Sequence, residues 1–369
     1  MAEALRDRYS PAWVAALAAA VAEAQPGFER RAFTRRVLGD GWEELALKQR
    51  MRRLSSALHA TLPGDYRAQL AVVEAVAPAF GGFEGMFGPD FVEVHGLDDF
   101  EASVPALAAL TRHSSSEFAV RPFIVRYGEP MMAVMRAWAR HPDEHVRRLA
   151  SEGSRPRLPW AMALTAFQRD PAPTLPILEA LRDDPSAYVR RSVANHLNDI
   201  SKDHPEQVLA IAKRWLGTSA RTDALVRHGL RTLLRRGEPR ALALLGHHEA
   251  AGVRVSGLRL AGARLRIGED QSFRFVVRLS GDEPAALRLE YAVDFVKAAG
   301  HTTRKVFWIG RRTVAPGTSI EIERRHRFRD FSTRRHHAGR HRIAILVNGV
   351  ERAARTFRLL PAGAPGTDG

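Results

Sequence analysis

Two segments of the chain share one pattern, and this repeat restricts the possible folds more than any other feature of the sequence. Its core is Val-Arg-Arg, which begins at Val146 and again at Val189, 43 positions later (189 − 146). Pro142 and Pro185 stand shortly before the two cores, and Pro is tolerated in the first turn of a helix but not in its interior. A self-similar segment of this length is typical of stacked helical repeats.

Residues 1 to about 247 have the pattern of short, successive helices. In one of them, Leu47, Met51 and Leu54 share a single helix face. Further helix starts are marked by the prolines at positions 130, 142, 171, 185 and 205. Val-Arg pairs at 120–121, 146–147, 189–190 and 226–227 mark the inner helices of an irregular array of HEAT-type repeats. The Gly- and Phe-rich stretch from Ala79 to Asp99 predicts a loop.

From about residue 252 the hydrophobic period changes from that of helices to two. Alternation is clear in residues 253–260, 273–279 and 320–323, and Asn348-Gly349 is a strong hairpin signal. About seven strands of this kind predict an immunoglobulin-like β-sandwich. The predicted fold class is therefore an all-α HEAT-like repeat solenoid in residues 1–247, an all-β sandwich in residues 252–360 and a disordered tail in residues 361–369.

The charge of the chain favours a polyanionic partner. Lys and Arg number 56 against 41 Asp and Glu, a formal net charge of +15, which suits nucleic acid or an acidic membrane surface. The preference for Arg over Lys is typical of a GC-rich genome, but that bias does not create net charge. The absence of Cys excludes disulfides and thiolate metal sites and favours a reducing cytoplasm. The apolar stretch Trp13 to Ala22 is too short to span a bilayer and predicts an amphipathic first helix rather than a signal peptide.

The second repeat carries a polar stripe that a scaffold alone does not require. On a helix that starts near Ser186, the apolar face is formed by Val189, Val193, Leu197 and Ile200. A second face carries Arg191, Asn195, Asp199 (or Asn198) and Lys202. These side chains either line one groove or form an ordinary solvated face with an Arg–Asp ladder.

Two further segments supply candidate site residues. In the first repeat the helix ends at Gly153 and a basic, Pro-rich turn with Arg155 and Arg157 leads to Trp160, which is either a core residue or a platform facing a base. The other segment is 111–118, with His113, Ser114 and Glu117. Its Ser114 to Glu117 spacing also fits a capping box, in which Glu117 only caps a helix.

Taken together, these residues resemble the AlkC branch of the HEAT-like-repeat alkylpurine DNA glycosylases. The resemblance covers nearly the whole chain, and the stretch 79–99 matches least well. The segments that carry it are 47–51, 115–123, 150–160, 189–202, 333–341 and 347–349. The most specific parts are Arg-Pro-Arg-Leu-Pro-Trp at 155–160 and Asn-His-Leu-Asn-Asp-Ile-Ser-Lys at 195–202.

The resemblance implies base excision repair: removal of N3-alkylated bases, chiefly 3-methyladenine, from duplex DNA, with Glu117, Asp199 and Trp160 as active-site residues. N3-alkylation gives the base a positive charge and makes it a good leaving group, so little acid catalysis is needed. Carboxylates would instead stabilise an oxocarbenium-like sugar and position water, with one possible general base among them. Trp160 would hold the cation by a cation–π contact. The family also implies that the enzyme kinks the duplex rather than flipping the base.

We expect the polar residues around this site to contact DNA, mostly through phosphates. They are Arg148, Arg155, Arg157, Arg191, Asn195, Lys202, His113 and Ser114 in the helical region, with Arg334, Arg335 and Arg340 in the sandwich. The sandwich arginines alternatively form only a charged outer face. His326 and His336-His337 stand among arginines and are expected to face phosphate, since no His cluster has metal-ligand spacing. The sequence implies no metal and no cofactor.

Two other functions fit parts of the sequence. A non-catalytic HEAT scaffold would bind DNA or an acidic protein with a steep salt dependence but would release no base. A peptide-binding solenoid would need an apolar concave groove, whereas Arg148, Arg155, Arg157, Arg191 and Lys202 predict a basic one. The sequence therefore predicts a monomeric, nucleoid-associated cytoplasmic glycosylase.

Overall fold

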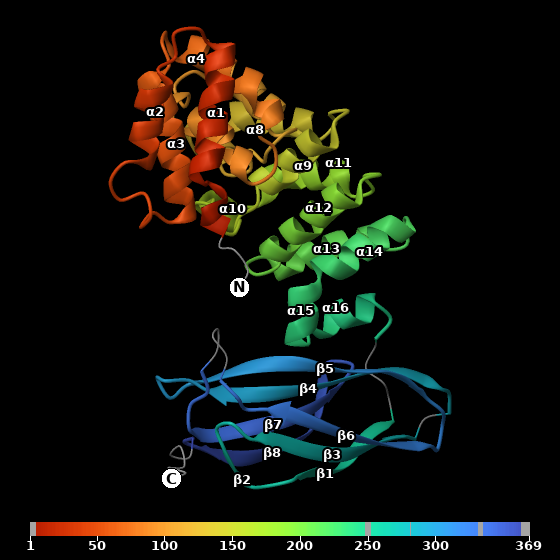
Figure 1. The fold of residues 1–369 in the computed structure, drawn as a ribbon. Helices are drawn as coiled ribbons and strands as arrows, with labels where there is room; N and C mark the ends of the chain where they lie inside the picture. The colour runs from red at the N-terminus through yellow and green to blue at the C-terminus, as the bar shows by residue number, and fades with distance from the viewer. Residues whose placement is uncertain (1–4, 248–251, 281, 331–334, 363–369) are drawn as a thin grey trace, which may run out of the picture. The chain divides into compact units, whose positions relative to one another are not determined.

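The structure is a computed structural model that describes residues 5–247, 252–280, 282–330 and 335–362. Helices occupy the described chain as far as Leu244, and strands occupy it from Val253 onward (Figure 1). The predicted order, an all-α region followed by an all-β region, is confirmed. Among the described helices, none is long and apolar enough to cross a membrane. From residue 363 on, the predicted tail lies outside the described residues.

The helical region is built from helices joined by turns and by longer connecting segments. They are α1 (Pro11–Ala24), α2 (Arg30–Leu38), α3 (Leu47–Thr61), α4 (Tyr66–Val76), α5 (Phe87–His95), α6 (Phe100–Leu110), α7 (Val120–Tyr127), α8 (Glu129–Trp138), α9 (Glu144–Gly153), α10 (Thr165–Arg169), α11 (Leu175–Leu181), α12 (Ala187–Ile200), α13 (Pro205–Trp215), α14 (Ala220–Gly229), α15 (Arg231–Arg236) and α16 (Pro239–Leu244). Short 3₁₀ turns lie at Leu5–Arg8, Ala77–Ala79, Glu84–Met86 and Ala172–Thr174. The chain divides into two compact units, residues 1–203 with 215–229 and residues 204–214 with 230–369.

The two Val-Arg-Arg cores occupy equivalent places in α9 and α12. Val146 and Val189 are fully buried. Arg147 and Arg190 each donate hydrogen bonds to two backbone carbonyls of the turn that precedes their own helix, at 2.6–3.0 Å. The shared residues of the repeat are therefore structural, because each pair anchors its helix in the core and closes the turn before it.

The prediction of a loop over residues 79–99 is wrong. The segment contains a 3₁₀ turn and helix α5, which buries Phe87 and Phe91. Its glycines serve close packing rather than loop flexibility: a Cβ on Gly85 would lie 1.9 Å from a backbone carbonyl oxygen. Pro89 stands in the first turn of α5, where Pro is tolerated. Composition therefore misled the prediction, because these Gly and Pro residues fit a packed helix start.

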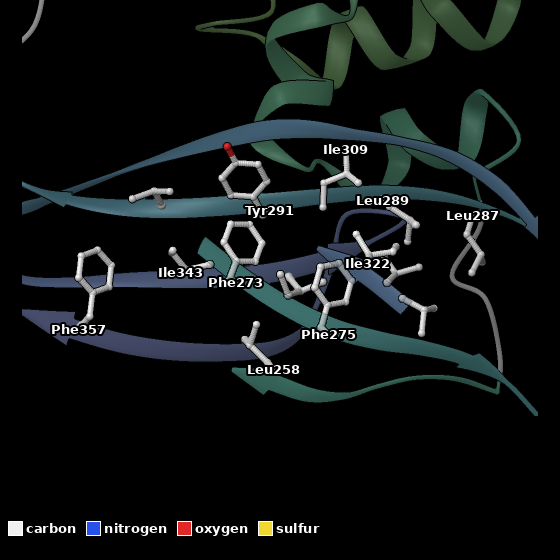
Figure 2. Close-up of a cluster of buried hydrophobic side chains, with 14 of the residues drawn as sticks. Leu258, Phe273, Phe275, Leu287, Leu289, Tyr291, Ile309, Ile322, Ile343 and Phe357 are labelled. Atoms are coloured by element: carbon white, nitrogen blue, oxygen red, sulfur yellow. The ribbon is translucent and has the colours of Figure 1, made fainter. Parts of the chain in front are cut away.

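The strands form two sheets that face each other across one core. They are β1 (Val253–Leu260), β2 (Arg264–Arg266), β3 (Asp270–Leu279), β4 (Ala285–Val296), β5 (Thr302–Val314), β6 (Ser319–Arg327), β7 (Gly339–Val347) and β8 (Val350–Leu360). One sheet has the order β1-β3-β6 and the other β2-β8-β7-β4-β5. Phe275 of β3 and Leu289 of β4 point into the space between the sheets (Figure 2). The predicted hairpin at Asn348-Gly349 is confirmed, since both residues have positive φ angles, 48° and 78°, and join β7 to β8.

Helices α15 and α16 belong to the compact unit that contains the sandwich. Gly349, between β7 and β8, packs closely against Leu242 of α16. A Cβ at position 349 would lie 2.1 Å from Cδ1 of Leu242, so the close packing requires a glycine there. The compact unit therefore includes helical residues before the change to strands. The domain limits at 247 and 252, inferred from the change of period alone, remain a prediction.

The expectation that His326 and His336 face phosphate is wrong. Both side chains are buried in the sandwich, where their rings contact Phe295 and Phe328 at centroid distances of 4.8–5.7 Å. The hydroxyl of Tyr291 lies 3.0 Å from Nδ1 of His326. Strand alternation explains the error, since His326 occupies an inward position of β6 and its arginine neighbours point outward. His337 is half-buried, and its role stays a prediction.

Stability should depend on pH through His196 of α12. This side chain is fully buried, and burial, reinforced by the nearby charge of Arg155, lowers the pKa of His196 to about 3. The unfolded chain takes up this proton near pH 6.5 whereas the folded chain does not. The free energy of unfolding should therefore fall as the pH drops from about 6.5 toward 3. Urea unfolding of wild type and His196→Gln between pH 7.5 and 5 should show a flatter dependence in the variant; equal curves would contradict the assignment.

Candidate functional site

A pocket of about 540 Å³ in the helical unit brings together several of the predicted site residues. Glu117, Trp160, Arg148, Arg155, His113 and Ser114 line it, with Phe83, Met86, Phe118, His145, Glu152, Leu158 and Tyr188 among the others. The lining comes from residues 82–86, from the segment before α7, from α9, from the turn after α9 and from the start of α12. Residues far apart in the sequence therefore meet at one concave site, as expected of a binding pocket.

Glu117 is fixed at the pocket by two donors and does not cap a helix. Ser115 Oγ donates to Glu117 Oε2 at 2.8 Å, and Arg148 Nη1 lies 2.7 Å from the same oxygen. The capping box is absent here, because α7 begins only at Val120 and Ser114 donates instead to a backbone carbonyl at Gly82. The capping interpretation of Glu117 is therefore wrong.

An alternating row of acids and bases runs from Glu117 to α12. Arg148 lies 2.7 Å from Glu117 and 3.7 Å from Glu152, and Arg155 binds both Glu152, at 2.6 Å, and Asp199, at 2.9 Å. Lys202 is the last member of the row, and its Nζ lies 2.9 Å from Oδ1 of Asp199, the oxygen that Arg155 does not bind. Burial alone would lower the pKa of Arg155, but the carboxylates of Glu152 and Asp199 outweigh burial and raise it.

The carboxylates of this row differ in their access to the pocket. The side chain of Glu117 is 16% exposed, whereas that of Asp199 is 2% exposed and lies behind Arg155. Glu152 lines the pocket but is also held by the hydroxyl of Ser192. Glu117 is thus the most accessible of the three carboxylates. Among the described residues, no group of three or more His, Asp or Glu side chains is arranged to hold a metal ion.

Trp160 is exposed at the pocket and is not a core residue. Its side chain is 63% exposed, and its ring meets Phe83 edge to face at 6.5 Å. Its φ angle of 64° is in the left-handed region, which costs a bulky residue roughly 1–2 kcal/mol. Lys48 Nζ donates to the Trp160 carbonyl at 3.0 Å and also lies 4.8 Å from the ring centroid of Phe118. Strain held by surrounding contacts is common at functional sites.

The predicted stripe on α12 does not line one groove. Arg191 is exposed, Asn195 lies 3.3 Å from His228 of α14, and Asp199 is buried toward the turn after α9. Of the residues expected to make the groove basic, Arg148, Arg155 and Lys202 each have a carboxylate partner, and their contacts with DNA stay predictions. Arg157 likewise binds Asp203 with both terminal nitrogens. A sequence shows which charges exist but not which of them pair across helices.

The remaining predicted DNA contacts lie in the sandwich unit or on the pocket rim. His113 is exposed, and Ser114 is buried. Arg335 and Arg340 are both exposed, and Arg340 makes one long hydrogen bond, 3.4 Å, to Thr356. Arg334 lies outside the described residues. The proposed contacts of these residues with DNA stay predictions.

Two regions of the chain match known families. Residues 109–231 match the family described as "DNA alkylation repair enzyme", and residues 254–361 match the "Uncharacterised protein YhaZ, C-terminal Ig-like domain". The uncharacterized protein YhaZ of Bacillus subtilis is 42% identical over 355 residues, which cover 96% of this chain and 99% of that protein. This chain belongs to the AlkC-like DNA alkylation repair enzymes. A solved structure of this family, the alkylpurine DNA glycosylase AlkC of Pseudomonas fluorescens bound to DNA containing an abasic site analog, is 39% identical and has a TM-score of 0.90 over 97% of this chain and 100% of that one.

Sequence reasoning missed several residues of this AlkC-like site. Glu152 joins Arg148 to Arg155, and its signal was present, since it stands at the place that Asn195 takes in the second repeat. Phe83 came from the segment predicted to be a loop, and no local pattern marks it. Tyr188, whose ring lies 4.9 Å from the guanidinium of Arg148, looked like an ordinary exposed residue near a helix start.

The backbone strain at Trp160 predicts an unusual order of stability among its variants. Trp160→Ala keeps the left-handed φ angle with a Cβ, whereas Trp160→Gly adopts it without steric cost. We therefore expect Trp160→Gly to unfold with a free energy about 1 kcal/mol higher than Trp160→Ala, the reverse of the usual order. Urea unfolding of the two proteins measures this difference. An Ala variant more stable than the Gly variant would show that the turn relaxes.

Proposed function

We propose that this protein is a monofunctional DNA glycosylase that hydrolyses the N-glycosidic bond of cationic N3-alkylated bases, chiefly 3-methyladenine, in duplex DNA. The observation that carries the proposal is the pocket shared by the carboxylate of Glu117 and the exposed ring of Trp160. The proposal is also supported by the membership of this chain in the DNA alkylation repair enzymes. We also propose that it acts as a monomer and, as a cytoplasmic protein, at the nucleoid.

The chemistry requires negative charge near the sugar rather than an acid near the base. When the bond breaks, its electron pair goes to the alkylated base, which leaves neutral, and the sugar becomes oxocarbenium-like. The carboxylate of Glu117 stabilises that positive charge electrostatically. Water then adds to C1′ and gives a proton to Glu117, which acts as the general base.

The other residues of the site support this carboxylate and the cationic base. Arg148 and Ser115 hold Glu117 in one position, as two donors on one oxygen. Asp199 acts through Arg155, because Arg155 lies between it and the pocket, and adds negative potential at the site. Trp160 offers an exposed aromatic face to a cation, a contact worth about 1–2 kcal/mol when it is desolvated.

Release of the damaged base should separate these roles. We expect wild type to release 3-methyladenine from methylated duplex DNA. We expect Glu117→Gln and Asp199→Asn to lower kcat by roughly 10²- to 10³-fold, because each removes a preorganised charge. Trp160→Ala should lower kcat by about tenfold. Single-turnover assays with folded protein give these values.

A matched carboxylate controls for loss of a surface ion pair. Asp183 binds Arg221 and Ser219 away from the pocket lining, so Asp183→Asn should keep the wild-type rate. Absence of base release by wild type would reject the glycosylase proposal and favour a DNA-binding scaffold. Full activity of folded Asp199→Asn would reject the role of Asp199 alone.

Arg191 should contribute to affinity but not to chemistry. It is exposed, and no described residue forms an ion pair with it. A contact to one phosphate predicts that Arg191→Ala weakens binding to damaged and undamaged duplexes equally and reduces the slope of log K against log salt by about one. Fluorescence anisotropy at several salt concentrations measures both quantities. An unchanged slope would exclude this contact.

A further inference from the structure

The Val-Arg pair at 120–121 departs from the pattern that the pairs at 146–147 and 189–190 share. Arg147 and Arg190 hold the turn before their own helix, through carbonyls five or six positions earlier. Arg121 is the second residue of α7, whereas Arg147 and Arg190 are the fourth residues of their helices, and its side chain binds no carbonyl of the turn before its own helix. Its three hydrogen bonds reach carbonyls 32, 34 and 41 positions later in the chain.

Those carbonyls bracket the turn that carries the site residues. Arg121 Nη1 donates to the carbonyl oxygens of Gly153, at 2.9 Å, and of Arg155, at 2.8 Å. Its Nε donates to the carbonyl oxygen of Met162, at 2.8 Å. Since Trp160 lies between these points, one guanidinium holds both ends of the turn. The side chain of Arg121 is 0% exposed, so these bonds do not compete with water.

The turn needs such support because it has little regular structure of its own. Between the end of α9 and the start of α10 it makes a few backbone hydrogen bonds, from Ala161 to Leu158 and from Leu164 to Pro156. It also contains the left-handed Trp160, whose conformation is strained. A strained residue keeps its conformation only when surrounding contacts over-determine it.

We propose that Arg121 is a positioning residue for base excision: its guanidinium locks the 154–161 turn so that Arg155 and Trp160 keep their places at the pocket. Lys48, which binds the Trp160 carbonyl, supports the same turn at its middle. This inference rests on the proposed glycosylase function for its kinetic consequence, but the locking of the turn itself does not depend on that function.

The chemistry of Arg121 is unusual for a purely structural residue. No carboxylate binds it directly, and its Nη2 has no hydrogen-bond partner among the described residues. Burial, and then repulsion from Arg155, lowers the pKa of Arg121 to about 10. A Lys cannot replace the planar fork that spans three carbonyls, because its ammonium is a single point of donation. The geometry therefore requires Arg rather than positive charge alone.

The test compares Arg121→Lys with Arg190→Lys. Arg190 also donates to two carbonyls of one turn, but that turn lies outside the pocket, so Arg190→Lys controls for loss of helix-array stability. At a temperature where both variants are folded, Arg121→Lys should lower kcat by about tenfold with little change in KM, since a small misplacement of site groups slows chemistry more than binding. Arg190→Lys should stay within about twofold of wild type.

A double-mutant cycle with Trp160→Ala separates positioning from general destabilisation. If Arg121 acts largely through Trp160, the double variant should be about tenfold to thirtyfold slower than wild type, not the hundredfold that independent effects would give. Full multiplication of the two effects, or equal kcat losses in Arg121→Lys and Arg190→Lys, would overturn the inference.

Hydrogen–deuterium exchange provides a readout that needs no activity. Amides of residues 154–164 should exchange faster in Arg121→Lys than in wild type or Arg190→Lys. Unchanged exchange there would reject the lock. If wild type releases no base while this exchange increases, the glycosylase proposal fails and the structural lock stands.

Discussion

The site depends on the buried part of the row of acids and bases, in which Glu152 of α9 binds Arg155 of the following turn and Arg155 binds Asp199 of α12. These three side chains join two repeats and the segment between them. Removing Arg155 would leave Glu152 and Asp199, which are both buried, with one cationic partner fewer each, and the loss of a buried ion pair is destabilising. The pocket wall, the turn and the second repeat are therefore held in one arrangement by a small number of ion pairs.

These ion pairs explain how a chain of net charge +15 carries carboxylates at its pocket. The arginines nearest the pocket, Arg148 and Arg155, are paired with acids of their own unit. They orient the carboxylates, and Glu117 receives two donors on one oxygen. Arg191 of α12, by contrast, is exposed, and no described residue forms an ion pair with it.

The turn after α9 combines rigidity with strain. Trp160 has an exposed ring and a left-handed backbone, and neither property favours folding by itself. Lys48 donates a hydrogen bond to the carbonyl of Trp160. Arg121 donates to the carbonyls of Arg155 and Met162, before and after Trp160 in the chain. Support of this kind preorganises the turn, because little ordering then remains to be done when a ligand binds.

The repeat, the change of hydrophobic period near residue 252 and the Asn348-Gly349 hairpin could all be predicted, because local periodicity and turn chemistry determine secondary structure. Sequence also located Glu117 and Trp160, which do meet at one pocket. Charge pairing could not be predicted, since Arg155 and Asp199 are 44 positions apart. The helix within 79–99 and the buried His326 depended on packing against distant elements. The sequence by itself determined which elements form, and only the tertiary structure decided which charges are neutralised, because ion pairing depends on distances that span the fold.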